Sequence, residues 1–232
     1  MSYEVIKIAE NSWRIEDTMV RCFLFTGTQY ALLVDTGFGN GDLKSVVSEL
    51  IGDLSLILVN THADGDHIGG NSQFLEAHMH PSEFARYAAS EGKTAVAPLW
   101  DGVTIDLGGR EFMALLIPGH TPGSIALLDE ENKILIGGDT ISSTAIFMFG
   151  EGRSLDAYIA SLEQLDALRG DGEVFNTVYP SHGEFPVSAD IISGLLAGAR
   201  RLKAGELEGG EPPFPVPAKL YDVGVAGFLY CE

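Results

Sequence analysis

The segment His62-Ala63-Asp64-Gly65-Asp66-His67 places two imidazoles and two carboxylates within six consecutive residues. Imidazole nitrogen and carboxylate oxygen are donors that suit zinc, iron and manganese. The segment begins two residues after residues 54–59, a short and nearly all-apolar run that predicts a buried strand. Because binding residues gather on loops held by a rigid scaffold, we interpret this segment as the start of a metal site.

Three further donors follow predicted strands in the same way. His120 lies in the sequence PGHTPGS of residues 118–124, Asp139 ends the sequence GGD, and His182 lies in the sequence PSHG of residues 180–183. Any one of them alone is better explained as a turn former or a surface group. Four strand-end loops together favour a metal site whose candidate ligands are His62, Asp64, Asp66, His67, His120, Asp139 and His182.

A calcium loop is the competing interpretation of Asp64-Gly65-Asp66. An EF-hand loop needs oxygen ligands over twelve residues, with Gly at the sixth position and Glu at the twelfth. Counted from Asp64, these positions hold Gly69 and Leu75. The missing Glu excludes that interpretation.

The pattern of the whole chain predicts a mixed α/β (α+β) fold. Period-two alternation in the N-terminal third predicts an antiparallel meander, and residues 43–51 have helical spacing after a cap at residues 40–42. Further strands are expected near residues 103–107, 111–117, 124–128, 133–136 and 174–179, and helices near residues 155–168 and 191–199. Two sheets covered by helices would form a four-layer αββα sandwich. A proline-rich run at residues 212–217 is expected to lead the last strands, within residues 220–230, to a sheet edge.

Length and charge narrow the class of protein. The 232 residues predict one domain, over residues 1–232, and a formal net charge of −19 argues against nucleic acid as a partner. We expect no membrane span, because no apolar run is long enough. The opening Met1-Ser2-Tyr3-Glu4 lacks the basic start and apolar run of a signal peptide, so we expect a cytoplasmic protein. The oligomeric state is not predicted.

In these motifs and their order the chain resembles the metallo-β-lactamase superfamily, whose opening motif reads His-x-His-x-Asp-His. A strand and turn at residues 34–37, reading VDTG, extend the resemblance from about residue 3 to residue 183. The resemblance implies two divalent metal ions: His62 and His120 at the first, Asp66, His67 and His182 at the second, and Asp139 bridging both. It also implies that Asp35 braces the ligand loop by hydrogen bonds.

The departure from the family motif is Asp64, which stands where the family has its second histidine. As a ligand, Asp64 would lower the net charge of the site and raise the preference for iron or manganese, although zinc is the metal we expect first. Family relatives with a di-iron redox centre carry a carboxylate at this position. These metal preferences remain open on sequence grounds.

The resemblance implies a dinuclear hydrolase that acts on a small molecule: a metal-bound hydroxide attacks an ester, thioester, lactone or related carbonyl, and Asp66 orients the nucleophile. With Asp at position 139, the site is more similar to thioesterases, glyoxalase II enzymes and lactonases than to β-lactamases with Cys there. Phe147, Met148 and Phe149 are candidates for a substrate-pocket wall, with core packing an equal explanation. The alternatives are a di-iron redox module served by a separate flavoprotein and a degenerate metal-binding scaffold.

Overall fold

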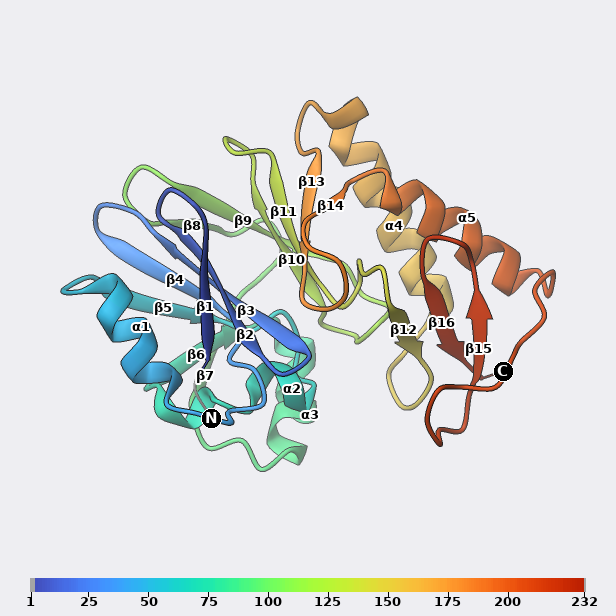
Figure 1. Ribbon diagram of the computed structural model, residues 1–232, viewed down its shortest axis with the longest axis horizontal. Helices are drawn as coiled ribbons and strands as arrows, with labels where there is room; N and C mark the ends of the chain where they lie inside the picture. Colours follow the sequence, from blue (N-terminus) through green and yellow to red (C-terminus); the bar gives the residue numbers. More distant parts are fainter. Residues whose placement is uncertain (1–2, 232) are drawn as a thin grey trace. The chain divides into compact units, whose positions relative to one another are not determined.

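The computed structural model describes residues 3–231, and the chain divides into two compact units, Met1–Leu115 and Leu116–Glu232 (Figure 1). Met1 and Ser2, on which part of the expectation about a signal peptide rests, lie outside the described residues. Among the helices of the described residues, none combines the length and the apolar character that a membrane crossing requires. The single domain expected over residues 1–232 stays a prediction.

A seven-stranded sheet, in the chain order β1 to β7, forms the framework of the first unit (Figure 1). Its strands are β1 (Glu4–Ala9), β2 (Ser12–Asp17), β3 (Val20–Thr26), β4 (Tyr30–Val34), β5 (Ser55–Val59), β6 (Glu76–Met79) and β7 (Ala95–Pro98). The first four pair antiparallel, which confirms the meander predicted from period-two alternation. From β4 to β7 the pairing is parallel, so the loops after β4 and β5 leave the sheet at the same edge.

Helix α1 (Leu43–Ile51) connects β4 to β5 and covers the sheet. It begins where the sequence predicts, because the Asp42 carboxylate accepts the backbone N–H of Ser45 at 3.0 Å. Its buried residues Leu43 and Val47 join a core cluster with side chains of β2, β3, β4 and β5. The other elements of this unit are α2 (Gly65–Ile68), η1 (Asn71–Gln73), η2 (Pro81–Glu83), α3 (Phe84–Ala89) and the antiparallel pair β8 (Thr104–Asp106) and β9 (Glu111–Leu116).

The second unit contains a sheet with the strand order β14-β13-β11-β10. Its strands are β10 (Ile125–Asp129), β11 (Ile134–Gly138), β13 (Thr177–Pro180) and β14 (Val187–Ser188). Helices α4 (Leu155–Arg169) and α5 (Ile191–Lys203) pack side by side, and η3 (Gly170–Gly172) follows α4 (Figure 1). Because β11 and β13 pair in parallel, Asp139 and His182, which follow them, leave the sheet at one edge.

The last strands, β15 (Lys219–Asp222) and β16 (Gly227–Tyr230), form a separate three-stranded sheet with β12 (Ala145–Met148), in the order β12-β16-β15. Of the two strands expected at a sheet edge, β15 lies at one, whereas β16 does not. The physical reason is β12, which the sequence pattern did not predict and which pairs in parallel with β16. β16 is consequently central in this small sheet.

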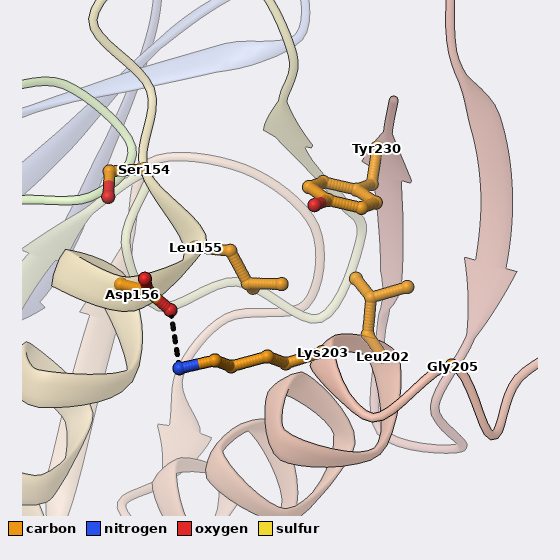
Figure 2. Close-up of a pocket in the computed structure, with 7 residues that line it drawn as sticks. All are labelled: Ser154, Leu155, Asp156, Leu202, Lys203, Gly205 and Tyr230. Atoms are coloured by element: carbon orange, nitrogen blue, oxygen red, sulfur yellow. Dashed lines mark ion pairs between the residues drawn. The ribbon is translucent and has the colours of Figure 1, made fainter. Parts of the chain in front are cut away.

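A cavity of about 310 Å³ lies in the second unit (Figure 2). It is lined by Ser154, Leu155, Asp156, Leu202, Lys203, Gly205 and Tyr230. The ion pair between Lys203 Nζ and Asp156 Oδ1, at 2.7 Å, is formed by two largely exposed side chains. None of the candidate ligands or of Phe147, Met148 and Phe149 lines this cavity.

Candidate metal centre

The loop after β5 and the short helix α2 bring four candidate ligands together in the first unit. His62 and His67 are buried, with ring centroids 4.0 Å apart. His62 Nε2 lies 3.7 Å from Asp64 Oδ2, and His67 Nε2 lies 3.7 Å from Asp66 Oδ2. Each imidazole therefore has its Nε2 atom directed toward a carboxylate of the same segment.

Asp35 fixes this loop from the end of β4. Its Oδ1 accepts the N–H of Thr61 at 2.8 Å, and its Oδ2 lies 2.8 Å from both Thr61 Oγ1 and His67 Nδ1. A proton on His67 Nδ1 shared with this carboxylate leaves Nε2 as the nitrogen that can donate an electron pair to a metal. The hydrogen bonds expected between Asp35 and this loop are present, and their effect on metal binding stays a prediction.

A second set of contacts reaches the same loop from η2 and α3. The fully buried Glu83 accepts the backbone N–H of Ala63 at its Oε2 atom, at 2.9 Å. Arg86 donates to Asp64 Oδ1 from Nε at 2.8 Å and lies 2.7 Å away at Nη2. Sequence reasoning missed Glu83 and Arg86, because a helix about twenty residues downstream carries no local sign of which loop it will contact.

The second unit holds the other three candidate ligands on three loops. His120 Nε2 lies 3.7 Å from Asp139 Oδ2, and His182 Nε2 lies 3.2 Å from Asp139 Oδ1. His120 Nδ1 lies 3.0 Å from the carbonyl oxygen of Phe147, which orients the ring in the way that Asp35 orients His67. Asp139 thus offers one oxygen to each of two histidines.

Glycine lets the chain pass close to α4 just before His120. Gly119 has φ of 142°, and a Cβ atom at this position would lie 2.4 Å from Tyr158 Cα. Ser161 Oγ also donates to the carbonyl of Pro118 at 2.7 Å. Helix α4 therefore holds the backbone of the loop that carries His120.

The seven candidate ligands are all of residue types that bind divalent metal ions. All seven candidates are among the His and Asp side chains of the described residues that could hold a metal ion. His62, His67 and His120 each have Nδ1 within 3.0 Å of an oxygen atom, which orients the imidazole of a metal ligand through its other nitrogen. Imidazoles and carboxylates are ligand types that suit zinc, iron and manganese.

The remaining histidines have structural partners. His78 Nδ1 lies 3.2 Å from the carbonyl oxygen of Leu58, and the buried His80 accepts the N–H of Ser82 at Nδ1, at 3.3 Å. Burial lowers the pKa of His80 from its ordinary value of 6.5, because the charged imidazolium is disfavoured there, while Glu83 and Asp101 oppose this shift. Neither histidine belongs to a group that could hold a metal within the described residues.

The three candidates for a pocket wall lie on and beside β12. Met148 is buried, which agrees with the core-packing explanation for that residue. Phe147 and Phe149 are partly buried, with ring centroids 5.7 Å apart, and Phe214 lies 5.9 Å from Phe147. A role of this aromatic group in substrate binding stays a prediction.

The fold and the donor set together define a mixed α/β protein with His and Asp side chains at its strand ends that could hold a metal ion. The chain belongs to the metallo-beta-lactamase superfamily, which matches residues 15–182. It is 27% identical over 197 residues to the acyl-coenzyme A thioesterase MBLAC2 of Gallus gallus, covering 69% of this chain and 71% of that protein. It is 34% identical over 145 residues to a hydroxyacylglutathione hydrolase of Synechococcus, covering 61% of this chain and 55% of that protein.

A solved metallo-beta-lactamase from Pontibacter korlensis has the same fold. The TM-score is 0.71 at 19% sequence identity, and the likeness covers 86% of this chain and 99% of that structure. The predicted mixed α/β fold class of the metallo-β-lactamases is therefore confirmed, as is the family that the sequence motifs resemble.

Proposed function

We propose that this protein is a metal-dependent hydrolase that cleaves a thioester of a small molecule. The observation that carries the proposal is the donor set of four histidines and three aspartates, in which oxygen atoms orient three of the imidazoles. The similarity to an acyl-coenzyme A thioesterase and to a hydroxyacylglutathione hydrolase supports a thioester over the ester and lactone substrates also expected from the sequence.

For the ligands we propose two groups and a bridge. His62, Asp64 and His120 would hold one metal ion, and Asp66, His67 and His182 the other. Asp139 would bridge both ions, since its two oxygens already lie near different histidines. Zinc is the metal we propose first, with iron or manganese as the alternatives that the three carboxylates favour.

The reaction adds water across the carbonyl–sulfur bond. When bound, the metal ions supply Lewis acidity, which makes the attacking water easier to deprotonate and stabilises the developing oxyanion. Asp66 would accept a hydrogen bond from this water and orient it toward the carbonyl carbon. A carbon–oxygen bond forms, the carbon–sulfur bond breaks, and the proton lost by the water goes to the leaving thiolate, giving a carboxylic acid and a thiol.

The partly buried Phe147 and Phe149, together with the exposed Phe214, would bind the apolar part of the acyl chain. The test is a comparison of Phe147→Ala with the unaltered protein on short and long acyl thioesters. We expect the substitution to raise KM, and to raise it more for the long acyl chain than for the short one, with kcat little changed. An equal KM change for both chain lengths would contradict this role.

Hydrolysis is tested with purified protein loaded with Zn²⁺, using acyl-coenzyme A and acylglutathione thioesters and detecting the released thiol. We expect turnover that Asp139→Ala abolishes together with the metal, whereas Asp156→Ala, which changes an exposed aspartate beside the cavity of the second unit, keeps both. Unchanged hydrolysis by Asp139→Ala would falsify the mechanism.

A di-iron redox module is a second candidate function. The Asp64 carboxylate favours it, because a carboxylate is a harder ligand than an imidazole and raises the preference for iron. Protein produced in medium with ample iron separates the two. Two zinc ions per chain without visible absorbance would support the hydrolase, whereas two iron ions per chain with no thioester turnover would support the redox module. One tight metal ion and no turnover would instead support the degenerate scaffold.

A further inference from the structure

Asp64 occupies the N-cap position of helix α2 but does not cap it. An Asp at this position ordinarily accepts a backbone N–H from the first turn of the helix. Here the backbone of Asp64 is extended, with φ of −75° and ψ of 150°, and its side chain makes no such hydrogen bond. The carboxylate is directed instead to Arg86 on α3. The capping explanation, which is the ordinary one for Asp before a helix, therefore does not account for Asp64.

The geometry of the contact distinguishes the two oxygens of Asp64. Arg86 Nε and Nη2 both approach Oδ1, at 2.8 and 2.7 Å, while Oδ2 lies 3.7 Å from His62 Nε2. Two charge-assisted donors on Oδ1 hold that oxygen against the guanidinium of Arg86. Oδ2 is thereby kept on the side of His62.

Burial makes this ion pair more than an ordinary surface contact. The side chain of Asp64 is 15% exposed and that of Arg86 is 32% exposed. The neighbouring Glu83, from the same turn of chain, is fully buried and accepts the N–H of Ala63. Residues 81–89 therefore hold two consecutive residues after His62, one through its backbone and one through its side chain.

We propose that Arg86 is a positioning residue, which orients Asp64 so that Oδ2 binds the metal ion held by His62. The inference rests on the proposed metal site and not on the identity of the substrate. Without Arg86, the Asp64 carboxylate would rotate, and part of the metal affinity would be lost in ordering it. Loss of the positive charge of Arg86 would by itself raise the affinity for a metal cation. A lower affinity without Arg86 therefore indicates positioning, and a higher affinity indicates that Arg86 only masks the charge of Asp64.

The experiment titrates Zn²⁺ into metal-free full-length protein and follows heat of binding. In Arg86→Gln we expect one of the two binding events to weaken by about tenfold. Arg86→Lys, which keeps the charge but loses the planar fork, should weaken the same event to a smaller extent. The matched control is Arg200→Gln, which removes an exposed Arg pair with Glu163 on α4 and should leave both events unchanged.

A double-mutant cycle tests whether Arg86 acts through Asp64. In an Asp64→Asn background, Arg86→Gln should cause no further loss of Zn²⁺ affinity. Unchanged or tighter binding in Arg86→Gln, or an equal loss in the Asp64→Asn background, would overturn the positioning role while leaving the proposed function intact. Failure of the unaltered protein to bind Zn²⁺ would overturn the proposed metal site itself. Circular dichroism of each variant separates a local effect from loss of the fold.

Discussion

The Oδ2 atom of Asp35 lies 2.8 Å from Nδ1 of His67, and Asp35 itself has the left-handed φ of 62°. A residue at this backbone conformation is uncommon unless it is Gly, Asn or Asp. The turn after β4 therefore places the carboxylate beneath the ligand loop, where it also holds Thr61.

Asp35→Asn tests this arrangement, because Asn tolerates the same backbone conformation but cannot accept all three hydrogen bonds. We expect the Zn²⁺ affinity to fall by about 10- to 100-fold. The free energy of unfolding of the metal-free protein should fall by about 1–3 kcal/mol, since buried donors lose an acceptor. Calorimetric titration and urea unfolding measure the two effects.

The control for Asp35→Asn is Asp42→Asn, since Asn also serves as an N-cap and Asp42 is exposed. It should change neither the metal affinity nor, by more than about 0.5 kcal/mol, the stability. Equal metal affinity in the Asp35→Asn variant and the unaltered protein would contradict the bracing role.

Gly119→Ala should destabilise the protein by about 3 kcal/mol, because the new methyl group would overlap the backbone of Tyr158 and the φ of 142° would strain any other residue. Gly65→Ala is the control, since a Cβ there has no neighbour within 4 Å. Urea unfolding of metal-free protein checks both. A stability loss of the same size in the two variants would show that the contact with Tyr158 is not the cause.

Acid should destabilise the protein partly through His80. Burial lowers the pKa of His80 in the folded state, so the unfolded chain binds the proton more readily. The contribution of His80 is therefore absent well above pH 6.5, and stability falls as the pH drops below 6.5 toward the folded-state pKa.

His80→Asn isolates the contribution of His80 to acid sensitivity, because an Asn side chain can also accept the backbone N–H at the start of η2. Urea unfolding between about pH 5 and pH 7 should show a shallower loss of stability in His80→Asn than in the unaltered protein. Parallel pH curves for the two proteins would exclude His80 as a source of the acid sensitivity.

Removal of metal should lower the thermal stability, since ions that bind only the folded chain stabilise it by mass action. At a free metal concentration 100 times the dissociation constant, the stabilisation is about 2.7 kcal/mol. For a chain of this size that amounts to a Tm shift of roughly 5–10 °C. Differential scanning fluorimetry with a chelator, followed by Zn²⁺ in excess, measures the shift, and Asp139→Ala should show little response to either addition.

The sequence predicted the elements whose signals are local. Helix α1 has both an apolar face and a capping Asp42, and β1 to β4 alternate in period two, so their positions were found closely. The strands β7, β12 and β14 were missed, because they have only two to four residues and are defined by their pairing partners. For β12, that partner is β16, far along the chain.

In the candidate site, too, the features with local sequence signals were predicted and those that depend on tertiary packing were not. Its seven donors were selected from the sequence, because each is a metal-binding residue type directly after a predicted strand. The contacts of Glu83 with Ala63 and of Arg86 with Asp64 could not be predicted, since they depend on how residues 81–89 pack against a loop that is distant in sequence. Residue type marks the donors, whereas tertiary packing decides how they are held.

The pairing of β12 with β16 gives the C-terminal tail a part in the geometry of a histidine that precedes it by more than a hundred residues. Strand β16 pairs with β12, and β12 contains Phe147, whose carbonyl oxygen lies 3.0 Å from His120 Nδ1. A chain shortened just after His182 would retain every candidate ligand but would lose β16, the strand that pairs with β12. Such a truncation would therefore disturb the orientation of His120 and also remove buried core residues such as Ile192 and Leu195 of α5.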